Sequence, residues 1–179
     1  PQPLLPDVNL SSGSVSYDGK AYRATRLQLG LFGGPASLDG WYQPDVRQGA
    51  VSANWENLAF PKSFRHTGKL EATYSNPPAA ALSITAKVDT RGTAPKGPFE
   101  LVAGLEAQGQ TFHDLAWQLT APAVAWYRGQ PIVLNGLRAD GTYKQDEKQK
   151  LLTLAGVSLP AGHRLAGRGS YDLASRNWA

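Results

Sequence analysis

Hydrophobic and polar residues alternate along most of the chain with a period of two. The clearest run is 82–89 (LSITAKVD), in which every even position is apolar, including the small residue Ala86, and every odd position is polar. Alternate side chains of a strand point to opposite faces of a sheet, so each such run predicts a strand with one apolar face. The other runs are Leu27–Leu31, Phe99–Ala107, Leu115–Leu119, Val124–Trp126, Ile132–Leu134 and Leu165–Leu173.

Turn residues separate these runs at intervals of roughly ten residues, which is typical of all-β proteins. Gly, Pro, Asn and Asp supply the backbone angles that turns need. The predicted turns include Tyr17–Lys20, Gly33–Pro35, Gln43–Asp45, Ser75–Pro78, Ala94–Pro98, Thr120–Pro122, Arg128–Pro131, Asn135–Gly136 and Pro160–Gly162. The best helix candidate is Asp146–Leu154, although its half Leu151–Leu154 fits a strand equally well.

The pattern predicts an all-β fold in one β-rich domain, residues 1–179. We expect a curved antiparallel sheet that forms a β-groove, taco-like or an open half-barrel, with an apolar concave face. The alternative is a closed β-sandwich, in which a second sheet hides that face. Small residues leave space along the face and so favour the groove; these are Ala86, Ala103, Ala107, Gly141, Gly167 and Gly169.

A short phrase recurs, in which a Leu is followed by small residues and then by an aromatic residue. Its aromatic positions are Tyr42, Tyr74, Phe112, Tyr143 and Tyr171, which lie 28 to 38 residues apart. Such a period suits small groups of strands that stack on one another into a continuous sheet. The alternative is that amphipathic strands in a chain rich in Ala, Gly and Leu produce the phrase without any structural repeat.

Composition and charge exclude several classes of protein. The chain has no Cys, so disulfides, zinc–thiolate sites and thiol nucleophiles are excluded. The net charge is +4, but the 18 Lys and Arg residues are scattered, so a solvated sheet face explains them better than nucleic-acid binding. No run of apolar residues is long enough for a membrane-spanning helix.

The sequence offers no catalytic or metal-binding motif. His66, His113 and His163 are far apart and lack the spacing of metal ligands, and no nucleophile elbow occurs. We therefore expect no enzyme, no metal and no cofactor. A hydrolase built on a β-scaffold from distant His and Asp residues is the remaining enzymatic alternative.

The five Trp residues can be read in two ways. Aromatic side chains dominate the cores of proteins, and this is the more common explanation. They can also line an apolar groove or lie in an interfacial belt near lipid. In a closed sandwich, exposed Trp41–Tyr42 or Trp126–Tyr127 could instead stack on a sugar or on a protein partner of an adhesion or secretion system.

The segment Arg26–Gly40 resembles the strand, Phe-Gly-Gly, strand unit of bacterial AsmA-like and TamB-like envelope proteins, and Leu137–Tyr143 and Leu165–Leu173 resemble their repeated strands. Those proteins are bridge-like molecules of the periplasm, tethered to the inner membrane. Their grooves are thought to carry phospholipids toward the outer membrane, and some members support outer-membrane protein assembly. The absent Met is consistent with an excised slice of such a protein.

The resemblance implies that this chain is a periplasmic segment that shields phospholipid acyl chains, or another apolar ligand, and that its tether lies in a part of the protein outside the sequence given. An inner-membrane or outer-membrane protein is a further expected partner, and nucleic acid is not. We expect the groove to be lined by Leu27, Leu29, Leu31, Leu82, Ile84, Val88, Leu101, Leu105, Leu115, Trp117, Leu119, Ile132 and Leu134.

Overall fold

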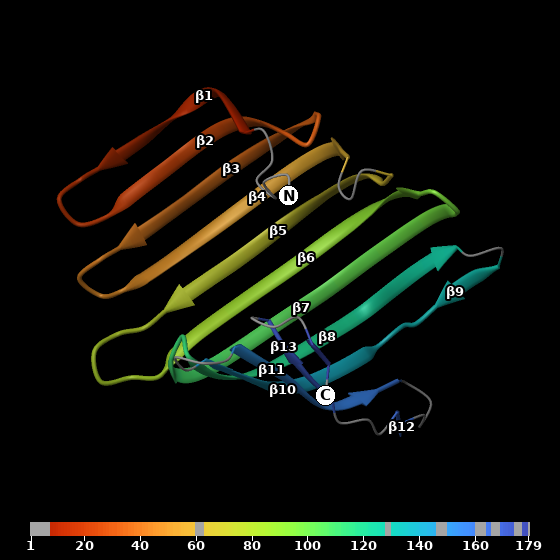
Figure 1. Ribbon diagram of the computed structural model, residues 1–179. Coiled ribbons are helices and arrows are strands. Elements are labelled where there is room, and N and C mark those ends of the chain that lie inside the picture. Colours follow the sequence, from red (N-terminus) through yellow and green to blue (C-terminus); the bar gives the residue numbers. More distant parts are fainter. Residues whose placement is uncertain are drawn as a thin grey trace.

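The computed structural model describes residues 8–59, 63–127, 130–145, 150–159, 164–165, 169–173 and 177–178. The described residues form strands and the turns between them (Figure 1). The strands are β1 (Val8–Tyr17), β2 (Tyr22–Leu31), β3 (Gly34–Gln43), β4 (Gln48–Leu58), β5 (Arg65–Ser75), β6 (Leu82–Ala94), β7 (Gly97–Thr111), β8 (Asp114–Tyr127), β9 (Pro131–Val133), β10 (Leu137–Gln145), β11 (Lys150–Ser158), β12 (Arg164–Leu165), β13 (Gly169–Asp172) and β14 (Asn177–Trp178).

All of these strands belong to one antiparallel sheet, in which neighbours in sequence are nearly always neighbours in space. The order runs β1 to β8, then β10, β11, β13 and β14, with β9 paired to β8 and β12 paired to β11. Figure 1 shows β1 to β8 as a twisted array of long strands, with β10, β11 and β13 turning across its lower end. The two ends of this path do not pair, so the sheet is open, and Figure 1 shows that it curves, as expected of a β-groove.

The strand register brings the apolar positions of neighbouring strands together. In the centre of the sheet, Leu70 lies opposite Val88, which lies opposite Ala103, and Ala86 lies opposite Leu105. Directly opposed residues of an antiparallel pair point to the same face. Followed from strand to strand, this register produces one continuous apolar face and one polar face.

Bulges keep the apolar residues on one face where the sequence changes phase. In β2 the register shifts between Ala24 and Leu27. The apolar face is therefore formed by even-numbered residues before the shift and by odd-numbered residues after it. A second shift in β8 lets Leu119 and Val124 share the apolar face. Each extra residue also bends the strand, which increases the curvature of the sheet.

The structure overturns one sequence prediction about local structure and decides between the two alternatives of another. Thr120–Pro122 is not a turn, because β8 continues through it to Tyr127. Pro122 is tolerated there because it lies at the bulge, where a ladder hydrogen bond is already missing. For Asp146–Leu154 the strand alternative is confirmed over 150–154, which belongs to β11, while 146–149 lies outside the described residues.

The buried residues of the strands all lie on the apolar face. They include Leu58, Leu82 and Thr90 together with four alanines, at positions 36, 107, 121 and 139. The larger aliphatic residues of this face are mostly half-buried, while polar residues of the other face are mostly exposed. The apolar face is therefore the more buried of the two, as expected for the concave side of a curved sheet.

A closed sandwich is excluded for the part of the chain that the structure describes, because all of its strands lie in one sheet. The accessible surface is 12380 Å². A compact folded protein of this mass would expose about 8,400 Å². The excess agrees with a single layer whose concave face is not covered by a second sheet.

Candidate functional site

The predicted lining residues gather on the concave apolar face, which is the candidate site. Leu27, Leu29 and Leu31 point to this face from β2, as do Leu82, Ile84 and Val88 from β6. Leu101, Leu105, Leu115, Trp117 and Leu119 do the same from β7 and β8, and Ile132 from β9. Leu134 lies just after β9, where its backbone N–H donates to the carbonyl oxygen of Val124.

An aromatic row runs along one end of this face, and it explains the repeat in the sequence. The rings of Tyr42 and Tyr74 lie 6.3 Å apart between centroids, and those of Tyr74 and Phe112 stack at 5.5 Å. Tyr17 and Tyr22 stack at 4.6 Å, and Tyr22 lies opposite Tyr42. The repeated aromatic residue therefore comes at the same end of the sheet once per pair of strands.

A hollow of about 480 Å³ lies at the other end of the face, where β6, β7 and β8 end or begin. Phe64 and Phe99 meet edge to face at 5.3 Å, and Leu101, Val124 and Trp126 complete the apolar part of its wall. The volume falls within the range of about 300–1,000 Å³ that small-molecule pockets occupy. The hollow is thus large enough to hold part of an apolar ligand.

Next to this hollow is a small polar cluster formed by Trp55, His66 and Thr90. The indole N–H of Trp55 donates to Nδ1 of His66 at 2.9 Å, and Oγ1 of Thr90 lies 2.9 Å from the same nitrogen. An indole N–H can only donate, so in this arrangement Nδ1 accepts and the ring carries its proton on Nε2. His66 thus has a structural role on the apolar face, which no sequence motif indicated.

The prediction that small residues leave space along the apolar face is wrong at Gly141. Gly141 lies directly opposite Trp117, and a Cβ atom added to it would come within 2.6 Å of the indole ring. The ring therefore fills the space above this glycine, as Trp55 does above Gly68. Gly141 supports a large neighbour and does not leave an open space, whereas Gly167 lies outside the described residues.

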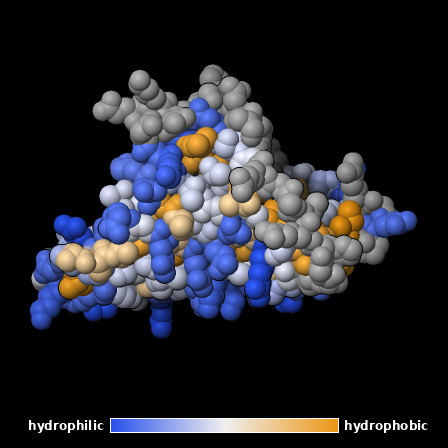
Figure 2. All heavy atoms as spheres, turned by 90° about the horizontal axis from the view of Figure 1, so that it is seen from below, coloured by the Kyte–Doolittle hydropathy of each residue, from blue (hydrophilic) through white to orange (hydrophobic). Residues whose placement is uncertain are grey.

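The convex face has the character of a solvated surface. Lys69 lies opposite Asp89, and Glu71 lies opposite Lys87. Opposite charges placed across a strand pair favour that register, each by a fraction of a kcal/mol. Figure 2 shows hydrophilic side chains along the lower margin of the molecule and hydrophobic patches above them. Lys69 and Lys87 thus belong to a mixed polar face.

The described residues hold no group of three or more metal-ligating side chains. His113 lies in the turn between β7 and β8, where its backbone N–H donates to Oγ1 of Thr111. Within the same residues, no helix is both long enough and apolar enough to cross a membrane. The feature left for function is the apolar face itself.

Comparison with known proteins adds no relative. The chain matches no protein-family model, and neither the curated proteins nor the solved structures contain a match to it. The function is therefore argued from the site.

Proposed function

We propose that this chain is a segment of a bridge-like envelope protein of the AsmA-like and TamB-like kind, and that its concave face shields phospholipid acyl chains. The shielding serves transport between the inner and outer membranes, or outer-membrane biogenesis. The proposal places the segment in the periplasm, with a tether to the inner membrane outside the sequence given. A membrane protein at either end is a further partner in this proposal.

The observation that carries the proposal is the continuous, half-exposed apolar face of an open sheet. Isolated exposed apolar residues are normal, but contiguous exposed patches mark sites of interaction with apolar ligands, membranes or proteins. Here the face extends over all the long strands and has an aromatic row at one end and the hollow near Phe99 at the other. Its length suits an extended ligand better than a compact one.

The energetics favour a chain-like apolar ligand. Removing one methylene group from water contributes about 0.8 kcal/mol. An acyl chain that places a dozen methylenes against the face would gain roughly 10 kcal/mol before the loss of translational and conformational entropy. The face offers few polar groups that would have to be desolvated, since His66 and Thr90 already bond to neighbours.

The test uses photo-crosslinking amino acids placed on the two faces of the same strand. Ile84 and Leu29 lie on the concave face, whereas their chain neighbours Thr85 and Gln28 lie on the convex face. We expect lipid adducts, identified by mass spectrometry after irradiation in cells, at Ile84 and Leu29 and not at the two control positions. Each control is one residue away, so expression and strand position are matched.

Equal adduct yields on both faces, or none at Ile84 and Leu29 with well-expressed protein, would contradict the proposal. Native mass spectrometry of the purified chain gives an independent measurement, in which bound phospholipid should appear as a defined mass increment. A protein adduct at Ile84 in place of lipid would show that the apolar face is a protein-docking surface.

A further inference from the structure

A second hollow, of about 430 Å³, lies on the polar convex face, over the strands β2 to β5. The register places its side chains in two neighbouring rows. Arg23, Trp41, Ala50 and Thr73 form one row, and Asp39, Ser52 and Glu71 form the other. The small residues of β4 lie in the middle of both rows, between strands β3 and β5 that are about 10 Å apart. The sheet therefore forms the floor of the hollow, and longer side chains on both sides form its walls.

Trp41 distinguishes this hollow from the rest of the polar face. Its side chain is 38% exposed, whereas Trp55, Trp117 and Trp126 are half-buried on the apolar face. No described ring stacks on Trp41, and its neighbour across β4 is the small Ala50. The indole thus lies outside the apolar face and offers a flat, accessible aromatic surface to a ligand.

Hydrogen-bonding groups lie on both sides of the indole. Oδ1 of Asp39 accepts the backbone N–H of Arg26 at 2.9 Å, which holds the carboxylate beside the bulge of β2. Bulges are common next to functional sites, where they redirect side chains. Across the hollow, Glu71 makes no ion pair with any described residue, and Arg23 supplies donors next to Trp41. The hollow therefore combines an aromatic wall with acceptors and donors.

A pyranose ring of the glucose type has the complementary chemistry. Its C–H groups form two flat faces of low polarity, and its equatorial hydroxyls form a rim that both donates and accepts hydrogen bonds. A C–H face can stack on an indole, carboxylates accept bonds from the rim, and a guanidinium donates to it. A cationic ligand fits less well because Arg23 would repel it. An apolar ligand fits less well because Asp39 and Glu71 would lose water without gaining a partner.

We propose that this hollow is a carbohydrate-binding site, in which a glucose-type pyranose ring stacks on Trp41 and its hydroxyls bond to Asp39 and Glu71. Stacking on Trp41 does not require a closed sandwich, since the convex face of an open sheet presents the indole equally well. The site lies on the face opposite to the proposed acyl-chain site. The inference therefore does not rest on that function, and each can fail without the other.

An NMR titration of the isotope-labelled chain tests the proposal with two probes, cellotetraose, an oligomer of glucose, and chitotetraose, an oligomer of N-acetylglucosamine. We expect at least one of them, at millimolar concentration, to move the indole N–H signal of Trp41. The indole N–H of Trp55 donates to His66 on the apolar face, so its signal should stay in place. A Trp41 signal that neither oligosaccharide moves would overturn the proposal.

Two chain neighbours supply a matched pair of variants for the oligosaccharide that binds. Trp41 and Tyr42 are 38% and 39% exposed, but Tyr42 points to the other face, where it belongs to the aromatic row. We expect Trp41→Ala to raise the dissociation constant about tenfold or more and Tyr42→Ala to leave it nearly unchanged. Equal weakening by both substitutions would contradict a site on the convex face.

Glu71→Gln keeps the size of the side chain, so it tests the site even if Trp41→Ala fails to fold. We expect this variant to bind the oligosaccharide several-fold more weakly, because a neutral amide accepts a weaker hydrogen bond than a carboxylate. An affinity equal to that of the wild type would overturn the proposed contact between Glu71 and the sugar hydroxyls.

Discussion

The central strands and the N-terminal edge strand have the same kind of alternation but very different burial. In β6, Leu82 is fully buried and the apolar residues that follow it are half-buried, whereas every residue of β1 is exposed. In a single-layer sheet no second layer covers the apolar face, so an apolar side chain is buried only by its neighbours in the sheet. Position within the strand order therefore decides how much each apolar residue stabilises the fold.

This comparison predicts that stability is concentrated in the centre of the sheet. The strands β6, β7 and β8 have 13, 15 and 14 residues and flank one another, while β1 has 10 residues and one described neighbour. Local opening of a protein starts where few apolar contacts hold the backbone. Among the described strands, β1 should therefore open most readily, and the central strands hold the curvature of the face.

The largest expected effect comes from truncating Leu82. Leu82→Ala removes a fully buried side chain from the concave face, and we expect the free energy of unfolding in urea to fall by about 2–5 kcal/mol. The same truncation in β1, Leu10→Ala, should cost less than about 1 kcal/mol, because Leu10 is 63% exposed. Equal losses at the two positions would contradict the difference between centre and edge.

The second comparison uses two glycines whose surroundings differ. A Cβ atom at Gly141 would meet the carbonyl oxygen of Thr153 and the ring of Trp117, whereas at Gly30 the nearest atom is Cβ of Asn9 at 3.6 Å. Gly141→Ala should therefore destabilise the chain by about 1–3 kcal/mol. Gly30→Ala should be neutral or stabilising by up to about 1 kcal/mol, because alanine lowers the entropy of the unfolded chain.

Thermal unfolding measures both glycine variants, and the NMR signal of the Trp117 indole N–H reports the local change. This N–H is enclosed and has no hydrogen-bond partner among the described residues. We expect its signal to shift in Gly141→Ala and to stay in place in Gly30→Ala. A destabilised Gly141→Ala protein with an unmoved indole signal would mean that the backbone contact alone causes the loss.

The sequence was sufficient for the strands because alternation is a local property. Thr85 and Ile84 are adjacent in the chain and point to opposite faces, so the polarity of each residue indicates which face it occupies. The bulges were not predicted, since a shift such as that between Ala24 and Leu27 depends on the neighbouring strand. The mistaken turn at Thr120–Pro122 has the same origin, because the bulge there accommodates Pro122.

The candidate site was only partly predictable for a related reason. The aromatic positions of the repeat were visible in the sequence, but stacking of Tyr74 on Phe112 requires the register of strands far apart in the chain. The contact of Trp55 with His66 is likewise cross-strand, and no spacing in the sequence indicates it. The filled space above Gly141 shows that a small residue on an apolar face can support a large neighbour.

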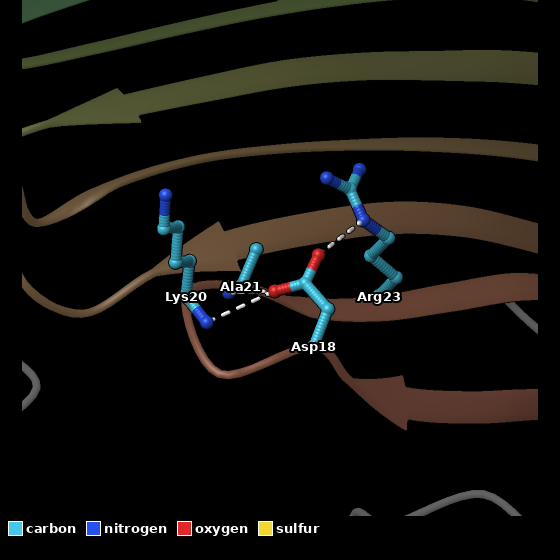
Figure 3. A network of polar contacts seen from close by, with 4 residues as sticks. All are labelled: Asp18, Lys20, Ala21 and Arg23. Atoms are coloured by element: carbon cyan, nitrogen blue, oxygen red, sulfur yellow. Dashed lines mark hydrogen bonds and ion pairs between the residues drawn. The ribbon is translucent and has the colours of Figure 1, made fainter.

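The smallest expected effect concerns the turn that joins the edge strand to the sheet (Figure 3). Oδ1 of Asp18 accepts hydrogen bonds from the backbone N–H groups of Lys20 and Ala21 at 2.9 and 2.8 Å, and Oδ2 lies 3.4 Å from Nε of Arg23. The bond from Ala21, followed by that from Lys20, lowers the pKa of the Asp18 carboxyl below its ordinary value, and desolvation opposes this only in part.

A lowered pKa in the folded state means that the carboxylate form stabilises the turn. The contribution is complete above the ordinary pKa of an aspartate, about 3.9, and is lost as the pH falls through the lower folded value. We expect Asp18→Asn to be less stable than the wild type near neutral pH and the gap to close in acid, as urea unfolding at several pH values would measure. A stability difference between the wild type and Asp18→Asn that does not change with pH would mean that the charge of Asp18 does not stabilise the turn.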